Sequence, residues 1–194
     1  WIAKLLRVVP AGLNACRKRG AWDVLCGEYF YGFAFSERGR VGDPPPESRL
    51  ALQQRILALF DLAINLENSH ENVLECSKLV ELLEAHMLRP TGVIPISGAI
   101  KRALAGPRRP YTVDSLYRCG FTARLANILL KQRSDAWETQ GGDEAMLELM
   151  GTPGLSDPRH QAAAARLELI DLLREILGAS ESMRRQVIRE WTVA

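Results

Sequence analysis

The chain has 194 residues, which is enough for one domain with a hydrophobic core of ordinary size. Hydrophobic residues make up 47% of the sequence and charged residues 25%, a composition that excludes a disordered chain. The formal net charge is only +2, so the chain lacks the overall basic excess that nucleic-acid-binding domains usually carry.

The N-terminal part of the chain predicts two helices followed by a loop. Trp1–Val9 has the pattern of a short helix that Pro10 closes, and Leu13–Phe35 has that of a longer helix that Gly20 interrupts. Two glycines and three prolines within ten residues then predict an exposed loop near residues 36–46.

The clearest helix is Glu47–Leu66, where apolar residues recur at spacings of three and four. Ser69 is the expected N-cap of the next helix, His70–Leu88, and Pro90 is expected to end that helix. Because the junction between the two helices is short, we expect them to form an antiparallel hairpin.

The rest of the chain predicts shorter helices separated by loops near residues 89–95, 105–111 and 151–158. The expected helices are Ile96–Leu104, Val113–Tyr117, Phe121–Gln132, Asp143–Met150, Arg159–Leu177 and Glu181–Val193. Gly178 is expected to end the helix before it as a C′ glycine. Val93–Ile96 is the one strand candidate, and Pro95 counts against it. The sequence therefore predicts an all-α fold.

The segment Ile56–Leu83 reads ILALFDLAINLENSHENVLECSKLVELL and resembles an armadillo repeat. The resemblance departs from the family pattern at Cys76–Ser77, where a glycine is usual. The residues that carry it are Leu57, Leu59, Leu62, Ala63, Asn65, Asn68, Val73, Leu79, Val80, Leu82 and Leu83. Weaker matches to the repeat pattern occur at Cys16–Phe30, Cys119–Leu130, Gln140–Met150 and Leu167–Glu190.

This resemblance implies an armadillo-like α-solenoid of stacked antiparallel hairpins, which residues 1–194 would form as a single helical domain. The physical pattern agrees, because a hairpin with one apolar face buries that face by stacking on its neighbours. A compact helical bundle is the alternative, since it shows the same apolar stripes.

The segment Trp22–Phe33, WDVLCGEYFYGF, is similar to the armadillo-like regions of large BEACH-domain scaffold proteins. That similarity implies a role in membrane trafficking or autophagy, with peripheral membrane association through a larger parent protein. Because the chain begins at Trp1 and its last helix has no stop signal, we expect a fragment of such a larger protein.

The cysteines and histidines do not have the spacing of zinc ligands. They are Cys16, Cys26, Cys76, Cys119, His70, His86 and His160. We therefore expect no metal and no cofactor, and reduced, buried cysteines in an intracellular, cytoplasmic protein. No apolar run reaches the roughly 18 residues that span a bilayer, so no transmembrane segment is expected.

No motif in the sequence predicts an enzyme. Glu71, Glu75, Glu81 and Glu84 share one expected helix, and paired carboxylates can perform acid–base chemistry. These acids alternate with the apolar stripe, however, so we expect them to form a solvated face. The phosphate-binding patterns G-x-x-x-x-G-K-[ST] and G-x-G-x-x-G are absent from the sequence. The expected function is a non-catalytic scaffold for protein–protein interaction.

Two surfaces are candidates for partner binding. Lys101–Arg133 is basic and includes only one acid, Asp114, and Trp22–Phe35 is rich in aromatic residues. The candidate residues are Lys101, Arg102, Arg108, Arg109, Tyr111, Tyr117, Arg118, Arg124, Trp22, Tyr29 and Tyr31. A protein is the expected partner, and a nucleic acid gripped through its phosphates is the alternative. A solvated basic face with aromatics packed in the core also accounts for both patterns.

Overall fold

The computed structural model describes residues 10–31, 46–66, 72–86, 90–131 and 158–191. Within these ranges the regular structure is helical throughout, and no strand is present in them. The predicted all-α fold is confirmed. The predicted helices Trp1–Val9 and Asp143–Met150, and the loop segments 36–45 and 151–157, lie outside the described residues.

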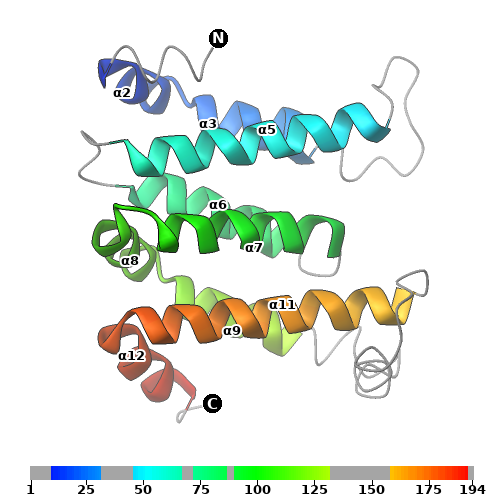
Figure 1. Cartoon of the computed structure of the whole chain (residues 1–194), viewed down its shortest axis with the longest axis vertical. Helices are drawn as coiled ribbons and strands as arrows, with labels where there is room; N and C mark the ends of the chain where they lie inside the picture. Colours follow the sequence, from blue (N-terminus) through cyan, green and yellow to red (C-terminus); the bar gives the residue numbers. More distant parts are fainter. Residues whose placement is uncertain (1–9, 32–45, 67–71, 87–89, 132–157, 192–194) are drawn as a thin grey trace.

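Three long helices form a first row, α5 (Pro46–Asn65), α7 (Pro90–Ala105) and α11 (Pro158–Ala179). In this row α5 packs against α7, and α7 packs against α11 (Figure 1). The chain runs in the same direction along all three helices, from the right to the left of Figure 1. Successive members of the row are therefore parallel and equivalent in position.

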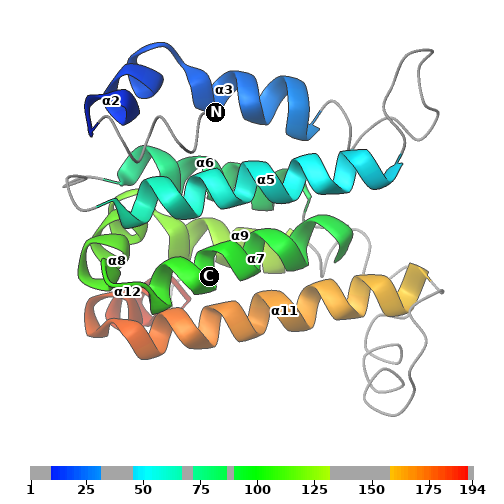
Figure 2. The ribbon, with the colours of Figure 1, turned by 45° about the horizontal axis from the view of Figure 1, so that its top comes forward.

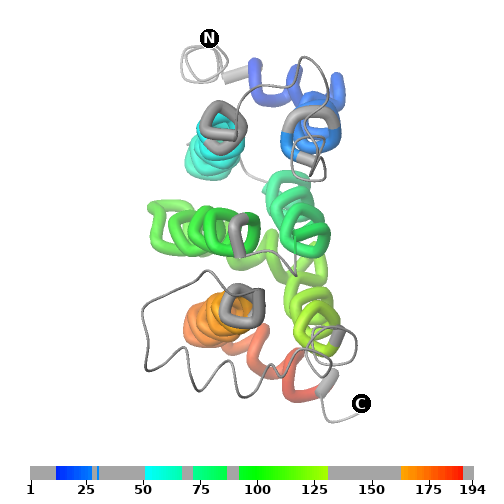
Figure 3. Tube along the Cα trace, turned by 90° about the vertical axis from the view of Figure 1, so that its right-hand side faces the viewer, coloured from blue at the N-terminus to red at the C-terminus, as the bar shows by residue number. Residues whose placement is uncertain are grey.

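A second row lies behind the first and runs in the opposite direction (Figure 3). It contains α3 (Ala21–Val24) with the π-helix η1 (Leu25–Tyr31), then α6 (Val73–Ala85) and α9 (Phe121–Lys131). The rows pack together where η1 and α6 meet α5, α6 meets α7, and α9 meets α11. The antiparallel pairing predicted for the helices around residue 69 is confirmed as α5 and α6.

Three short helices lie at one edge of the two rows, α2 (Pro10–Lys18), α8 (Arg109–Arg118) and α12 (Glu181–Trp191). Figures 1 and 2 both show them on the left, one below another along the molecule. Here α2 packs on α3, α8 packs on α6, α7 and α9, and α12 packs on α9 and α11. The chain therefore follows the order of short helix, second-row helix and first-row helix twice. The first series is α2, α3 with η1, and α5, before α6, and the second is α8, α9 and α11, after α7.

Prolines begin these helices rather than end them. Pro10, Pro46, Pro90 and Pro158 are the first residues of α2, α5, α7 and α11. Proline suits this place because the first turn needs no N–H donor within the helix and the ring presets the helical φ. The prediction that Pro90 ends a helix was wrong, because α6 ends at Ala85 and α7 begins at Pro90. Pro110, predicted to lie in a loop, is in the first turn of α8.

The predicted loop near residues 89–95 was also wrong, because α7 includes Pro95 in its interior. A proline there removes one backbone hydrogen bond and costs about 3 kcal/mol. The apolar side chains of α7 offset this cost, since full burial of each contributes about 1.5–3 kcal/mol. Val93, Ile96 and Ile100 are all buried between neighbouring helices. Tertiary packing therefore decides the conformation of this segment.

Two glycines with positive φ make the sharp turns before the second-row helices. Gly20 has a φ of 65° between α2 and α3, and Gly120 has a φ of 69° between α8 and α9. Glycine reaches this region without the Cβ clash that other residues meet. The predicted interruption at Gly20 is confirmed. The helix predicted to end at Gly178 ends at Ala179, but Gly178 does not have the positive φ of a C′ glycine, and the backbone N–H of Met183 then donates to Ser180 Oγ at 3.3 Å.

Asn72, and not Ser69, precedes the first residue of α6. The Asn72 side chain turns back and donates from Nδ2 to the Ile64 carbonyl at the end of α5, at 3.0 Å. Its backbone N–H donates to Ser115 Oγ on α8 at 3.3 Å. One buried residue therefore links the ends of α5 and α6 to α8. Ser69 lies outside the described residues.

The buried side chains form one continuous cluster that extends from Leu13 on α2 to Val187 on α12. Every helix in the described ranges contributes to a shared interior, and none buries its apolar face alone. In this core Trp22 stacks on Phe60, with ring centroids 4.4 Å apart. The continuous core agrees with elements that depend on their neighbours for stability.

The two glycines inside α7 provide a matched test of this packing. A Cβ at Gly92 would lie 2.6 Å from His86 Cβ and 2.7 Å from the ring, whereas a Cβ at Gly98 would meet only Arg102 Nη1 at 3.5 Å. We expect Gly92→Ala to lower the free energy of unfolding by about 1–3 kcal/mol through overpacking. Gly98→Ala is expected to raise it by about 0.5–1 kcal/mol, because alanine loses less backbone entropy in a helix. Urea unfolding of both variants checks this, and equal shifts would contradict it.

Candidate functional site

Glu75 on α6 is a buried carboxylate that joins the first two second-row helices to α2. Its side chain is 0% exposed. Arg17 donates from Nε to Oε1 and from Nη2 to Oε2, each at 2.7 Å, and Trp22 Nε1 donates to Oε1 at 2.9 Å. The prediction that Glu75 belongs to a solvated face was wrong, because three donors from α2 and α3 replace its water.

The aromatic segment contributes to the core where the structure describes its side chains. Trp22 is 3% exposed, and Phe30 is buried with its ring edge-on to His86 at a centroid distance of 5.2 Å. The placement of Trp22 on a partner-binding surface is therefore corrected, because its ring is covered and its N–H is used by Glu75. Tyr29 and Tyr31 are on η1, and their side chains lie outside the described residues.

Lys101 of the predicted basic stretch joins α7 to α11. Its Nζ lies 2.6 Å from Asp171 Oδ2 and 2.8 Å from Glu168 Oε1. Burial alone would lower the pKa of Lys101, but its hydrogen bonds to Asp171 and Glu168 raise it. The hydrogen bond from Lys101 in turn lowers the pKa of Asp171. The charge of Lys101 is therefore matched within the molecule.

Arg102 and Arg124 make similar contacts between helices. Arg102 Nε lies 3.6 Å from Asp61 Oδ2 on α5. Arg124 on α9 donates two hydrogen bonds to Glu84 on α6, from Nε to Oε1 at 2.9 Å and from Nη2 to Oε2 at 2.5 Å. The hydrogen bond to Glu84 raises the pKa of Arg124. Three cations of the predicted partner surface thus hold neighbouring helices together.

The remaining predicted residues gather on α8 and its cap. Tyr111 is 48% exposed and Tyr117 is 45% exposed. The guanidinium of Arg108 lies over the Tyr111 ring, 4.4 Å from its centroid, which is the geometry of a cation–π contact. Arg109 and Arg118 are also exposed, and Arg118 Nη1 lies 3.8 Å from Asp114 Oδ2. These exposed residues of the predicted surface are therefore accessible to a partner.

The fold places two further basic helices at the same edge as α8. We call this surface the basic edge, and it consists of residues 10–20, 108–118 and 181–191. Its cations are Arg17, Lys18, Arg19, Arg108, Arg109, Arg118, Arg184, Arg185 and Arg189, and its acids are Asp114, Glu181 and Glu190. Nine cations against its own three acids, with Glu75 of α6 matching Arg17, leave it a net charge of +5, whereas the whole chain carries +2. The charge of the molecule is therefore strongly asymmetric.

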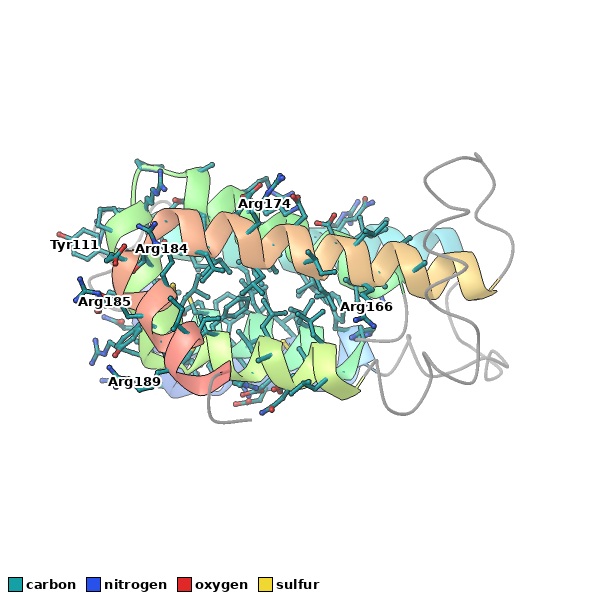
Figure 4. The ribbon with its side chains drawn as sticks, turned by 90° about the horizontal axis from the view of Figure 1, so that it is seen from below. Tyr111, Arg166, Arg174, Arg184, Arg185 and Arg189 are labelled. Atoms are coloured by element: carbon teal, nitrogen blue, oxygen red, sulfur yellow. The ribbon has the colours of Figure 1, made fainter. Side chains whose placement is uncertain are left out.

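The α12 part of the basic edge projects from the end of the molecule. Figure 4 shows Arg184, Arg185 and Arg189 on the same side as Tyr111. Glu181 is shared, since its Oε2 lies 2.7 Å from Arg184 Nη2 and its Oε1 lies 3.3 Å from Arg185 Nε. One carboxylate thus serves two guanidinium groups. The sequence predicted this helix but did not place it on the partner-binding surface, because α12 is far from α8 along the chain.

Burial surrounds three of the thiols, those of Cys26, Cys76 and Cys119. All four cysteines are unpaired. Burial raises the pKa of Cys26 to about 12 and also raises the pKa of Cys76 and of Cys119. Reactive cysteines have a lowered pKa, because the thiolate is the nucleophile.

Across the part of the chain that the structure describes, no group of three His, Cys, Asp or Glu side chains is placed to hold a metal ion. In the same residues, no helix is both long enough and apolar enough to cross a bilayer. Comparison of the chain with protein-family models, with curated proteins and with solved structures gives no match.

Two glutamates on α6 provide a test of the buried ion pair. Glu75 and Glu84 each receive two hydrogen bonds from an arginine of another helix, but the Glu84 side chain is partly exposed. We expect Glu75→Gln to lower the free energy of unfolding by about 3–5 kcal/mol, because Arg17 loses its buried counter-charge. Glu84→Gln is expected to cost only about 0.2–1 kcal/mol, because water screens that pair. Chemical denaturation measures both, and a smaller cost for Glu75→Gln than for Glu84→Gln would contradict the assignment.

The contact between α7 and α11 predicts a loss of stability in acid. The pKa of Asp171 is lower in the folded chain than in the unfolded chain, so ionised Asp171 stabilises the fold above its usual pKa. This contribution is lost as the pH falls through the lowered pKa. We expect the free energy of unfolding to depend less steeply on pH below about pH 5 in Asp171→Asn than in the unsubstituted chain. Urea titrations at several pH values test this, with Glu175→Gln on the same helix as the control, and identical slopes in all three proteins would refute it.

Proposed function

We propose that this chain is a non-catalytic scaffold segment that binds a partner protein. The basic edge carries the proposal, because the fold places three segments that are distant in sequence along one edge of the molecule, with exposed arginines on it and exposed tyrosines on α8. Arginine and tyrosine are enriched among the residues that dominate the energy of protein–protein interfaces. Lys101, Arg102 and Arg124 are the part of the predicted surface that this proposal leaves out, since they pair with acids of neighbouring helices.

The arrangement of the helices supports an armadillo-like α-solenoid as the architecture of the scaffold. The series α2, α3 with η1, and α5 has the same order and direction as the series α8, α9 and α11 (Figure 1). Between them, α6 and α7 continue the second and first rows. A compact bundle would not require such equivalent positions. Stacked repeats of this kind bind partners along extended surfaces.

The biological setting of the scaffold is part of the proposal. The similarity of Trp22–Phe33 to armadillo-like regions of BEACH-domain proteins suggests membrane trafficking or autophagy. Trp22 and Phe30 in this segment are core residues, so the similarity concerns how the helix packs and not which partner it meets.

A helical module that binds nucleic acid is the second candidate. Exposed Tyr111 and Tyr117 on an arginine-bearing helix favour it, because aromatic rings stack on bases while cations hold the phosphates. It ranks second because one face of the Tyr111 ring is already covered by Arg108.

Capture followed by reconstitution tests the proposed function. The chain is immobilised, proteins are captured from a nuclease-treated cell extract, and each captured protein is purified and titrated against the free chain by calorimetry. We expect at least one purified protein to bind directly, with a Kd of about 1 μM or tighter, as for a specific interface. If nuclease treatment removes every captured protein, the second candidate replaces the first. If no purified protein binds, the scaffold proposal is wrong.

A further inference from the structure

The basic edge is an extended surface and not a single pocket. Its three helices follow one another along the length of the molecule in both Figure 1 and Figure 2. Each contributes three cations, with no acid in residues 10–20, one in 108–118 and two in 181–191. A small anion would meet only one of these groups. A ligand that meets all three must itself be long and repeatedly negative.

The kind of cation favours carboxylates as the ligand groups. Eight of the nine cations are arginines, and Lys18 is the exception. The planar guanidinium fork matches a carboxylate with two parallel hydrogen bonds, which an ammonium cannot do. The chain itself uses this pairing between Arg17 and the buried Glu75, and between Arg124 and the partly exposed Glu84. The same chemistry is available to a partner at the exposed guanidinium groups.

The cations of the edge outnumber its carboxylates. Glu181 is shared between Arg184 and Arg185, and Asp114 lies 3.8 Å from Arg118. A net charge of +5 remains after these three acids and the pair between Arg17 and Glu75 are counted. Additional carboxylates from a partner would meet this remaining positive charge.

A lipid surface fits the edge less well than a peptide does. A helix that lies on a membrane inserts an exposed apolar face below the headgroups. In α12 the apolar residues Met183 and Val187 face the core, and Arg184, Arg185 and Arg189 face outward. Ile188, at 67% exposure, is the one large apolar side chain that this helix shows among its described residues. Charge and not apolar area therefore defines the edge.

We propose that the basic edge of α2, α8 and α12 binds an extended acidic segment of a partner protein, whose Asp and Glu side chains pair with the exposed arginines. Tyr111 and Tyr117 contact the parts of the acidic segment that lie between its charged side chains. This inference rests on the proposed scaffold function and assigns the partner's chemistry. Binding is electrostatic at its periphery, so it weakens as salt screens the charges.

Fluorescence anisotropy with a labelled synthetic peptide tests the inference. The probe is an extended peptide of about 20 residues with glutamate at every second or third position, and its control has glutamine in place of each glutamate. We expect saturable binding of the glutamate peptide that weakens at least about tenfold between about 50 and 300 mM salt, and no binding of the glutamine peptide. Vesicles with and without phosphatidylserine, and single-stranded polyuridine RNA, are titrated in parallel.

Matched charge reversals locate the binding site. Arg109→Glu with Arg185→Glu lies on the basic edge, whereas Arg55→Glu with Arg174→Glu lies on exposed positions of the first row. We expect the edge variant to weaken peptide binding at least about tenfold and the first-row variant to change it less than about twofold. Circular dichroism confirms that both variants keep the helical content of the unsubstituted chain.

The outcomes separate this inference from the proposed function. If RNA or the anionic vesicles bind through the edge and the peptide does not, the acidic-segment assignment is overturned. If a purified protein partner binds equally well to the edge variant, the assignment is overturned while the scaffold function stands. If no purified protein binds in the capture experiment, the scaffold function fails and this inference fails with it.

Discussion

The fully buried carboxylate of Glu75 fixes the positions of the helices around it in the N-terminal half of the structure. Glu75 is tolerated in the interior only because the Arg17 fork and the Trp22 indole reach it from α2 and α3. Those contacts fix α2 and α3 against α6. The stacking of Trp22 on Phe60 fixes α3 against α5. Lys18 and Arg19 follow Arg17 directly, so the contact that buries one cation places the next two at the edge of the molecule.

The cations of the chain divide into two groups that the fold separates. Lys78 and Arg17 join α6 to the helices before it, Arg124 joins α9 to α6, and Lys101 joins α11 to α7. These pairs lie along the stack, between helices of the same row or between α2 and the second row. The second group consists of Lys18, Arg19 and the cations of residues 108–118 and 181–191, which outnumber the acids of the same segments. The arrangement of helices thus turns a chain that is nearly neutral overall into a molecule with one strongly basic edge.

Local patterns predicted the elements whose signals lie within a single helix. The α5 helix was predicted almost to its ends because apolar spacing alone marks it. The interruption at Gly20 was predicted because three basic residues precede it and an apolar run follows, and the structure adds its positive φ. The helix start at Pro90 was missed, because proline is compatible with the start or the end of a helix and only the packing of Val93 and Ile96 decides between them. The burial of Glu75 could not be read from the sequence, since its partners are 53 and 58 residues away. The basic edge was predicted only at α8, because its other two helices join it through the fold.

The central claim is that partners meet this chain at the basic edge. Hydrogen–deuterium exchange of the chain, alone and in complex with its purified protein partner, examines that claim without any substitution. Slower exchange on binding is predicted in α8 and α12 and in the turn that follows α2, with the outward face of α7 and α11 unchanged. Protection along the first row, with exchange at α8 and α12 unaltered, would contradict the account.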